Sequence, residues 1–135
     1  MRNTLAGLVA AVLLTGCAYP ETKQLCSGTQ LVETQLYLGM SMPQGTKITE
    51  SEFAAFLKSD VVSRFPQGFT VFDAKGFWRD AQKQKTIAEN SKVIFRLHQA
   101  SMDEDTRINE IIQSFKRRFA QDSVLRTDKV VCAHF

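Results

Sequence analysis

The sequence predicts an α+β fold in which two helices cover one face of an antiparallel β-sheet. Two helix-start signals support this prediction: the capping boxes Thr49-Glu50-Ser51-Glu52 and Ser101-Met102-Asp103-Glu104, each followed by apolar residues at helical spacing. We expect the first helix to end at Pro66, because proline lacks the amide hydrogen that a helix interior needs. The second should end near the basic run 116–118, whose charges suit the negative end of a helix dipole.

Strand-like segments lie before, between and after the two helices, and apolar and polar residues alternate most clearly in 34–40 and 91–98. These segments are 34–40, 68–73, 77–80, 91–98 and 124–135. We expect a turn at 74–76 and a polar excursion at 81–90, which places 68–80 and 91–98 in one hairpin. The order β-α-β-β-α-β is typical of a ferredoxin-like two-layer sandwich with strand order 4-1-3-2.

The first sixteen residues have the layout of a secretory signal peptide, with Arg2 before an apolar run and Thr15-Gly16 at its end. The segment 14–17, Leu-Thr-Gly-Cys, is similar to a bacterial lipobox, so we expect cleavage before Cys17 and acylation of its thiol. Acyl chains on Cys17 would hold the protein at a membrane surface without a spanning helix. The alternative is an uncleaved leader that ends in an incidental cysteine.

These signals predict three parts: a signal peptide at 1–16, a lipidated N-terminus and polar tether at 17–27, and a folded domain at 28–135. Ala18 rather than aspartate follows Cys17, which in lipoproteins of Gram-negative bacteria implies sorting to the outer membrane. The expected location is therefore the inner leaflet of the outer membrane, facing the periplasm.

Composition limits the class of protein. A chain of 135 residues with 44% apolar residues has room for one small domain and is too hydrophobic to be disordered. A net charge of +3 is too small for a nucleic-acid-binding surface, and removal of Arg2 with the leader brings it closer to neutral. We find no motif for a catalytic nucleophile, a phosphate loop or a metal site, and expect no cofactor.

Two cysteines remain when Cys17 is acylated. In an oxidising compartment, Cys26 and Cys132 are expected to form a disulfide. The 4-1-3-2 strand order supports the same pairing, because it brings the start of the first strand next to the end of the last. The alternative is a redox or metal pair, for which His98 and His134 are the available imidazoles.

The sheet face away from the helices is the first candidate for a functional surface. Residue parity predicts that it presents Tyr37, Ile94, Arg96, His98, Val130 and His134, with Thr70 or Phe72. Three interpretations stay open: an ordinary solvated face, a face that self-associates, or a ligand or catalytic pocket. In the last case His98 is the best general base by residue type, with Arg96 and Tyr37 as polar neighbours.

Three shorter segments have both a functional and a structural interpretation. Trp78-Arg79-Asp80 would allow stacking on an aromatic or sugar ligand and binding of an anion, but a structural role at one end of the core is favoured. The acidic run 103–105 suits the start of a helix better than a metal site. The basic run 116–118 suits a helix end and would also reach anionic lipid headgroups.

Several motifs together resemble a bacterial family of domains of unknown function, number three-five-seven-four. They are Gln35-Leu36-Tyr37-Leu38-Gly39, Thr49-Glu50-Ser51-Glu52-Phe53, Arg64-Phe65-Pro66-Gln67-Gly68-Phe69-Thr70-Val71 and Asp73-Ala74-Lys75-Gly76-Phe77-Trp78-Arg79-Asp80. The resemblance covers nearly the whole expected domain. It agrees with the expected fold and export, and it implies no particular reaction.

The preferred hypothesis is a non-catalytic envelope lipoprotein, anchored through Cys17, that binds a protein partner or itself through the open sheet face. The alternative is an enzyme or small-ligand binder of the dimeric α+β barrel type, with a pocket around His98, Arg96 and Tyr37 and with Trp78 near its rim. A third hypothesis is a lipoprotein whose role is structural packing in the envelope.

Overall fold

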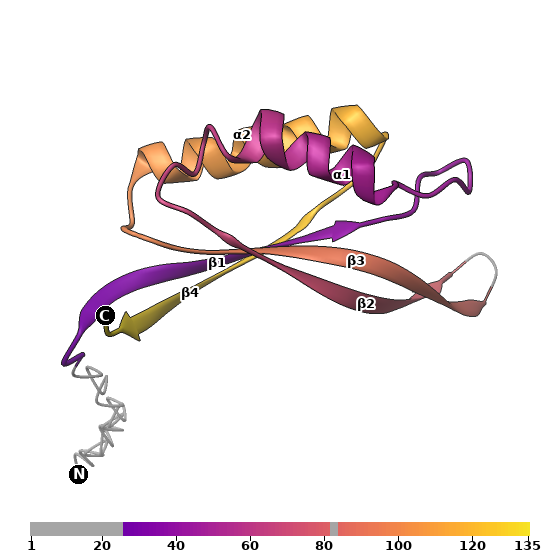
Figure 1. Cartoon of the computed structure of the whole chain (residues 1–135). Coiled ribbons are helices and arrows are strands. Elements are labelled where there is room, and N and C mark those ends of the chain that lie inside the picture. The colour runs from indigo at the N-terminus through magenta and orange to yellow at the C-terminus, as the bar shows by residue number, and fades with distance from the viewer. Residues whose placement is uncertain (1–25, 82–83) are drawn as a thin grey trace, which may run out of the picture.

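The described residues, 26–81 and 84–135, form two layers in the computed structural model (Figure 1). One layer is a four-stranded antiparallel sheet and the other consists of helices that lie across one of its faces. The expected signal peptide 1–16, the lipidation site Cys17 and the tether up to residue 25 lie outside the described residues. Within the described residues, no helix is both long and apolar enough to span a membrane.

The elements follow one another in the expected types. They are β1 (Thr29–Gly39), α1 (Glu50–Phe56), η1 (Leu57–Val61), β2 (Thr70–Asp80), β3 (Lys85–His98), α2 (Met102–Phe119) and β4 (Leu125–Ala133). The π-helical turn η1 directly continues α1, so the two form one helical segment. The sheet has the order β2-β3-β1-β4, and each neighbouring pair is antiparallel. The predicted α+β class is confirmed.

Both helices start where the capping boxes predict, but only the first box is complete. The Thr49 hydroxyl accepts a hydrogen bond from the Glu52 amide at 3.2 Å, and the Glu52 carboxylate accepts one from the Thr49 amide at 2.8 Å. At α2 the Ser101 hydroxyl accepts from the Glu104 amide at 3.1 Å, while the Glu104 side chain turns to Arg96 in the sheet. The helix α2 ends at Ala120, whose left-handed backbone (φ 51°) closes its last turn.

The expected turn at 74–76 and the excursion at 81–90 are wrong. β2 runs unbroken from Thr70 to Asp80 and pairs with β3 along its full length, from Thr70 opposite Phe95 to Asp80 opposite Lys85. Continuous backbone hydrogen bonding holds the ladder together through polar positions that have no alternating pattern. The resulting β2–β3 hairpin extends past the helices as an arm (Figure 1).

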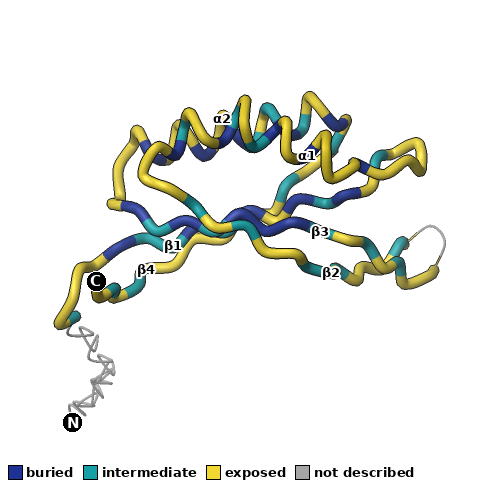
Figure 2. Tube along the Cα trace, in the orientation of Figure 1, coloured by how far each residue is buried: buried dark blue, intermediate teal, exposed yellow. Residues whose placement is uncertain are grey.

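The core lies between the helices and the sheet face that they cover, where buried segments of both layers face each other (Figure 2). The sheet contributes Leu36, Leu38 and Ile94, and the helical layer contributes Phe53, Phe56, Val61, Ile108, Ile111, Phe115 and Phe119. Phe56 and Phe115 join the two helices through an edge-on ring contact with centroids 5.3 Å apart. Full burial of each such side chain is worth about 1.5–3 kcal/mol.

The predicted facing of β3 is wrong. Ile94 pairs with Leu36 of β1, and residues directly opposite each other in an antiparallel ladder share a face, so Ile94 lies on the helix side. Arg96 and His98 follow at intervals of two and lie on the same side. Val93, Phe95 and Leu97 therefore point to the open face. The pattern misleads because both faces of this strand carry apolar residues and the charged ones find partners under the helices.

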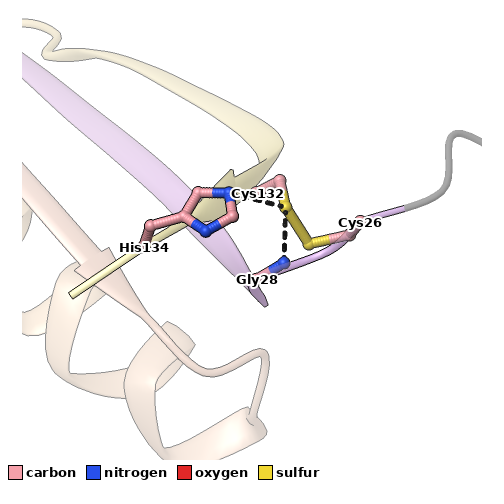
Figure 3. The surroundings of a disulfide bond; sticks show 4 residues. All are labelled: Cys26, Gly28, Cys132 and His134. Atoms are coloured by element: carbon pink, nitrogen blue, oxygen red, sulfur yellow. Dashed lines mark hydrogen bonds between the residues drawn. A yellow bond between two sulfur atoms is a disulfide. The ribbon is translucent and has the colours of Figure 1, made fainter.

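The expected disulfide between Cys26 and Cys132 is present and joins the start of the described chain to the end of β4 (Figure 3). The two Cα atoms are 5.4 Å apart. Beside it the Gly28 amide donates to the Cys132 sulfur at 3.3 Å, and His134 Nε2 lies 3.9 Å from the same atom. A side chain at Gly28 would collide with the Ala133 carbonyl oxygen, so this close approach of β1 and β4 requires glycine.

Candidate functional site

The open face of the sheet is apolar in its middle. By ladder register its large apolar members are Leu31, Tyr37, Phe72, Trp78, Ile87, Val93, Phe95, Leu97, Leu125 and Val131. Val93 is only 6% exposed although no helix covers it, because its neighbours on this face surround it. Phe72, by contrast, is 50% exposed and meets Phe95 edge-on, with ring centroids 6.0 Å apart. The face thus has a packed centre under an exposed aromatic layer.

Polar residues of β1 form a row along this face. The Tyr37 hydroxyl donates to Gln35 Oε1 at 2.7 Å, and Gln35 Nε2 donates to Glu33 Oε1 at 2.7 Å. Glu33 lies opposite Lys129 of β4, which adds an oppositely charged neighbour. Because β1 is an inner strand, the row crosses the face between the apolar Phe95 and Leu97 of β3 and the polar Thr127 and Lys129 of β4.

Not every residue expected on the open face lies there. Tyr37, Thr70 and Phe72 do by register. Ile94, Arg96 and His98 are on the helix side, and so is Val130, which pairs with Val32. His134 follows β4 and lies beside the disulfide. The predicted pocket of His98, Arg96 and Tyr37 is therefore not formed, because the sheet separates Tyr37 from the other two.

Arg96 forms a buried ion pair with Glu104 of α2. Its Nη2 and Nε atoms lie 2.9 and 3.2 Å from the two Glu104 oxygens, its Nη1 donates to the Gly68 carbonyl at 2.7 Å, and its guanidinium stacks 4.5 Å from the Phe65 ring centre. Burial opposes ionisation of Glu104, but the hydrogen bonds and charge of Arg96 outweigh it and keep the Glu104 pKa below its ordinary value. The pair serves to join the sheet to the helix.

His98 is occupied on both ring nitrogens. Nε2 lies 2.9 Å from the Thr34 hydroxyl, which donates to Asp128 at 2.5 Å, and Nδ1 lies 2.9 Å from the Gln99 carbonyl. A general base needs a nitrogen that can reach a substrate proton. His98 in this arrangement links three strands instead.

Trp78, Arg79 and Asp80 do not converge on one ligand position. Trp78 belongs to the open face and is 48% exposed, so the favoured structural role at one end of the core is also wrong. Arg79 alternates to the other side, where its Nη2 donates to Gln84 Oε1 at 2.7 Å. Asp80 ends β2 opposite Lys85.

The two charged runs of α2 are engaged in structure. In the acidic run, Asp105 pairs with Arg126 at 2.6 Å. In the basic run, Arg118 pairs with Asp60 at 3.2 Å. Among the described residues, no three histidine, cysteine, aspartate or glutamate side chains are grouped so as to hold a metal ion.

A cavity that the sequence did not predict lies where the β1–α1 loop faces the β2–β3 arm. Its volume is about 480 Å³, and its lining includes Lys47, Glu50, Asp73, Lys75, Glu89 and Lys92. Lys92 is buried, and its Nζ lies 2.5 Å from Asp73 Oδ1 and 2.8 Å from Glu50 Oε2. These two hydrogen bonds raise the Lys92 pKa. The contributing residues come from four segments, so no single stretch of sequence signals this site.

The protein is thus an α+β domain with an apolar sheet face and a separate polar cavity. Residues 33–135 match the family described as "Protein of unknown function (DUF3574)", and the chain belongs to this family. The resemblance drawn from the motifs is confirmed. A comparison with curated proteins finds no match.

Two solved structures have a similar fold. The phage SAM lyase in complex with S-methyl-5'-thioadenosine has a TM-score of 0.56 and 12% identity, over 82% of this chain and 95% of that chain. The phage SAM lyase in its apo state has a TM-score of 0.54 and 15% identity, over 78% of this chain and 92% of that chain. At these identities the similarity concerns the fold.

Proposed function

We propose that the protein is a lipid-anchored envelope protein whose domain associates with a second copy of itself through the open sheet face. The observation that carries this proposal is the apolar centre of that face. Phe72, opposite the packed Val93, and Leu125, opposite Tyr37, stay largely exposed there, and Trp78 is exposed farther out on the arm. Contiguous exposed apolar surface on a soluble domain is typical of an interaction site.

A second copy is a suitable partner for a face of this composition. In a two-fold dimer the same patch occurs on both sides, so the apolar centres of the two sheets would cover each other. Glu33 and Lys129 border the patch with opposite charges, and a two-fold arrangement gives each a complementary group on the partner. The association would be non-catalytic.

Anchoring at the membrane is the second part of the proposal. It is supported by the signal-peptide pattern of 1–16 and the lipobox that ends at Cys17. Cys17→Ser should move the protein from the membrane fraction to the soluble fraction of cells. Retention in the membrane fraction, with processing unchanged, would contradict the lipid anchor. We also propose that the fold is ferredoxin-like, which the β2-β3-β1-β4 order with the helices on one face supports.

The self-association is tested by sedimentation of residues 26–135, which contain the sheet, both helices and the disulfide. We expect a dimer that Phe72→Glu converts to a monomer, because a carboxylate would have to be buried in the apolar contact. Val62→Glu is the matched control, since Val62 is equally exposed, at 52%, but belongs to the helical layer. A wild-type monomer at all concentrations would contradict the proposal.

The alternative function, catalysis or ligand binding around His98, Arg96 and Tyr37, requires these side chains in one pocket, and their placement does not support it. The similarity to phage SAM lyase favours a small-molecule site only at the level of fold. Titration with S-methyl-5'-thioadenosine would test it directly: saturable binding would revive this second candidate.

A further inference from the structure

The cavity beside Lys92 is separate from the open sheet face and has the features of a ligand site. The β1–α1 loop, whose ends are joined by the Ser41–Lys47 bridge, lines one side of the cavity, and the β2–β3 arm lines the other. Figure 1 shows the loop above the arm at the same end of the sheet. Met40, Ile48, Ala74 and Ala88 contribute apolar surface to a lining that is otherwise polar. At about 480 Å³ its volume suits a compact small molecule.

Lys92 positions two acceptor groups in this cavity. Its side chain is about nine-tenths buried, yet the two carboxylates that it binds, on Glu50 and Asp73, are 79% and 86% exposed. Lys92 donates to one oxygen of each carboxylate, Glu50 Oε2 and Asp73 Oδ1. A carboxylate accepts several hydrogen bonds, so both retain capacity for a further donor. Lys92 thus holds the two carboxylates close enough together for the ammonium group of a ligand to contact both.

The same cavity also offers cations. Lys47 and Lys75 line it, are exposed, and make no ion pair with another of the described residues. Glu89, the third acidic residue, accepts a hydrogen bond from the Ser41 amide at 2.9 Å, which fixes the loop to the arm. Three lysines and three carboxylates leave the lining without net charge but with groups of both signs.

From this charge arrangement we propose that the cavity binds a small zwitterion of the α-amino acid class. The ligand's ammonium group would donate to Asp73 and Glu50, and its carboxylate would accept from Lys75 and Lys47. A phosphate-rich ligand fits less well, because three carboxylates would repel it. A divalent cation fits less well, because it needs several oxygen ligands around one point, and Lys92 occupies the point where Glu50 Oε2 and Asp73 Oδ1 meet. An ammonium group can instead donate to the carboxylate oxygens that Lys92 does not bind.

The test is thermal unfolding of the full chain in detergent micelles, followed by the fluorescence of its single tryptophan. The probes are the twenty free amino acids, first pooled and then one by one at ~10 mM. We expect at least one of them to raise the melting temperature, since a ligand bound to the folded state stabilises it. The N-acetyl derivative and the methyl ester of that amino acid, which each lack one charge, should bind at least tenfold more weakly.

Two variants connect this binding to the cavity. Lys75→Met and Asp73→Asn change exposed side chains, so both should fold, and each should weaken binding at least tenfold. Lys58→Met and Asp122→Asn are the matched controls on exposed positions that do not line the cavity. No stabilisation by any amino acid, equal binding of a single-charge derivative, or binding unchanged in both cavity variants would each overturn the proposal. Phe72→Glu should leave this binding intact, which separates it from self-association.

Discussion

Arg96 of β3 and Glu104 of α2 form an ion pair between the sheet and the helical layer, with Arg96 Nη2 2.9 Å from Glu104 Oε1. The guanidinium is also held by the Gly68 carbonyl and the Phe65 ring, so every part of it has a partner. This single contact fixes the orientation of the start of α2 over β3. It also explains why the second capping box is half-formed.

Removal of one partner of this ion pair should lower the free energy of unfolding strongly. Arg96→Met removes the hydrogen-bonded partner of the buried Glu104 carboxylate and leaves only the more exposed Arg107, 3.5 Å away, so we expect a loss of about 3–5 kcal/mol in the free energy of unfolding. The double variant Arg96→Met with Glu104→Met should recover most of the loss, because no unpaired charge remains. Urea denaturation measures both. Arg117→Met, on the exposed side of α2, is the control, and an equal loss there would contradict the assignment.

The same pair predicts an acid dependence of stability. The Glu104 pKa is lower in the folded protein than its ordinary value, so ionised Glu104 contributes stability above the unfolded-state pKa of about 4.3. That contribution is lost as the pH falls through the folded-state pKa. Unfolding free energies of wild type and Glu104→Gln, measured from pH 7 to pH 2, should therefore converge in acid. A constant difference would contradict this contribution of Glu104.

For Lys92 we expect the opposite pH dependence of the unfolding free energy, with a loss of stability at high pH. Hydrogen bonds from Lys92 to Asp73 and Glu50 raise its pKa above 10.5, so its contribution is complete below that pH and is lost as the pH rises through the folded-state pKa. Lys92→Met should remove this alkaline decline in unfolding free energy, while Lys58→Met should retain it. An unchanged decline in Lys92→Met would assign it to other groups.

Thr34 should be needed for the strand contacts of His98. Thr34→Val keeps the shape of the side chain but removes the hydroxyl between His98 and Asp128, and leaving buried polar groups unpaired costs about 1–3 kcal/mol. Chemical denaturation measures the loss. The same change at Thr86, exposed on the arm, should alter stability by less than about 0.5 kcal/mol. Equal effects at the two sites would show that the hydroxyl bridge contributes nothing.

Removal of the disulfide should lower the free energy of unfolding, because the unfolded chain gains conformational entropy when the cross-link is absent. The bond closes a loop with a sequence separation of 106, for which chain entropy gives at most about 4.7 kcal/mol. We expect Cys26→Ser with Cys132→Ser to lose about 2–5 kcal/mol in equilibrium unfolding. Reductant should lower the stability of wild type by the same amount and leave the double variant unchanged. Sensitivity of the double variant to reductant would contradict this assignment.

The helices and the disulfide were predictable because their signals are local or few in number. Thr49 and Ser101 mark the helix starts by side-chain chemistry alone, and two remaining cysteines allow one pairing. The length of the β2–β3 arm was not predictable, because residues 74–80 and 85–91 gain strand structure from pairing with each other. A ladder of this kind depends on backbone hydrogen bonds, which side-chain periodicity does not report.

The faces of β3 and the cavity could not be predicted for a related reason. Arg96 and His98 are residue types that are usually exposed. Only the fold shows that Arg96 pairs with Glu104 and that His98 contacts the Thr34 hydroxyl. Alternation of apolar and polar residues does not identify the buried face of a strand when buried charged residues have partners and the open face is itself apolar. Lys92, Glu50 and Asp73 likewise come together only through the fold, and they are far apart in the sequence.

The disulfide also determines how the domain carries a mechanical load. Cys26 is the first described residue, and its bond to Cys132 joins it covalently to the end of β4. A pull from the N-terminal side is therefore shared between the two neighbouring strands β1 and β4, which are loaded together instead of being peeled apart. The polar cavity lies toward the other end of the sheet, away from the point where such a force enters.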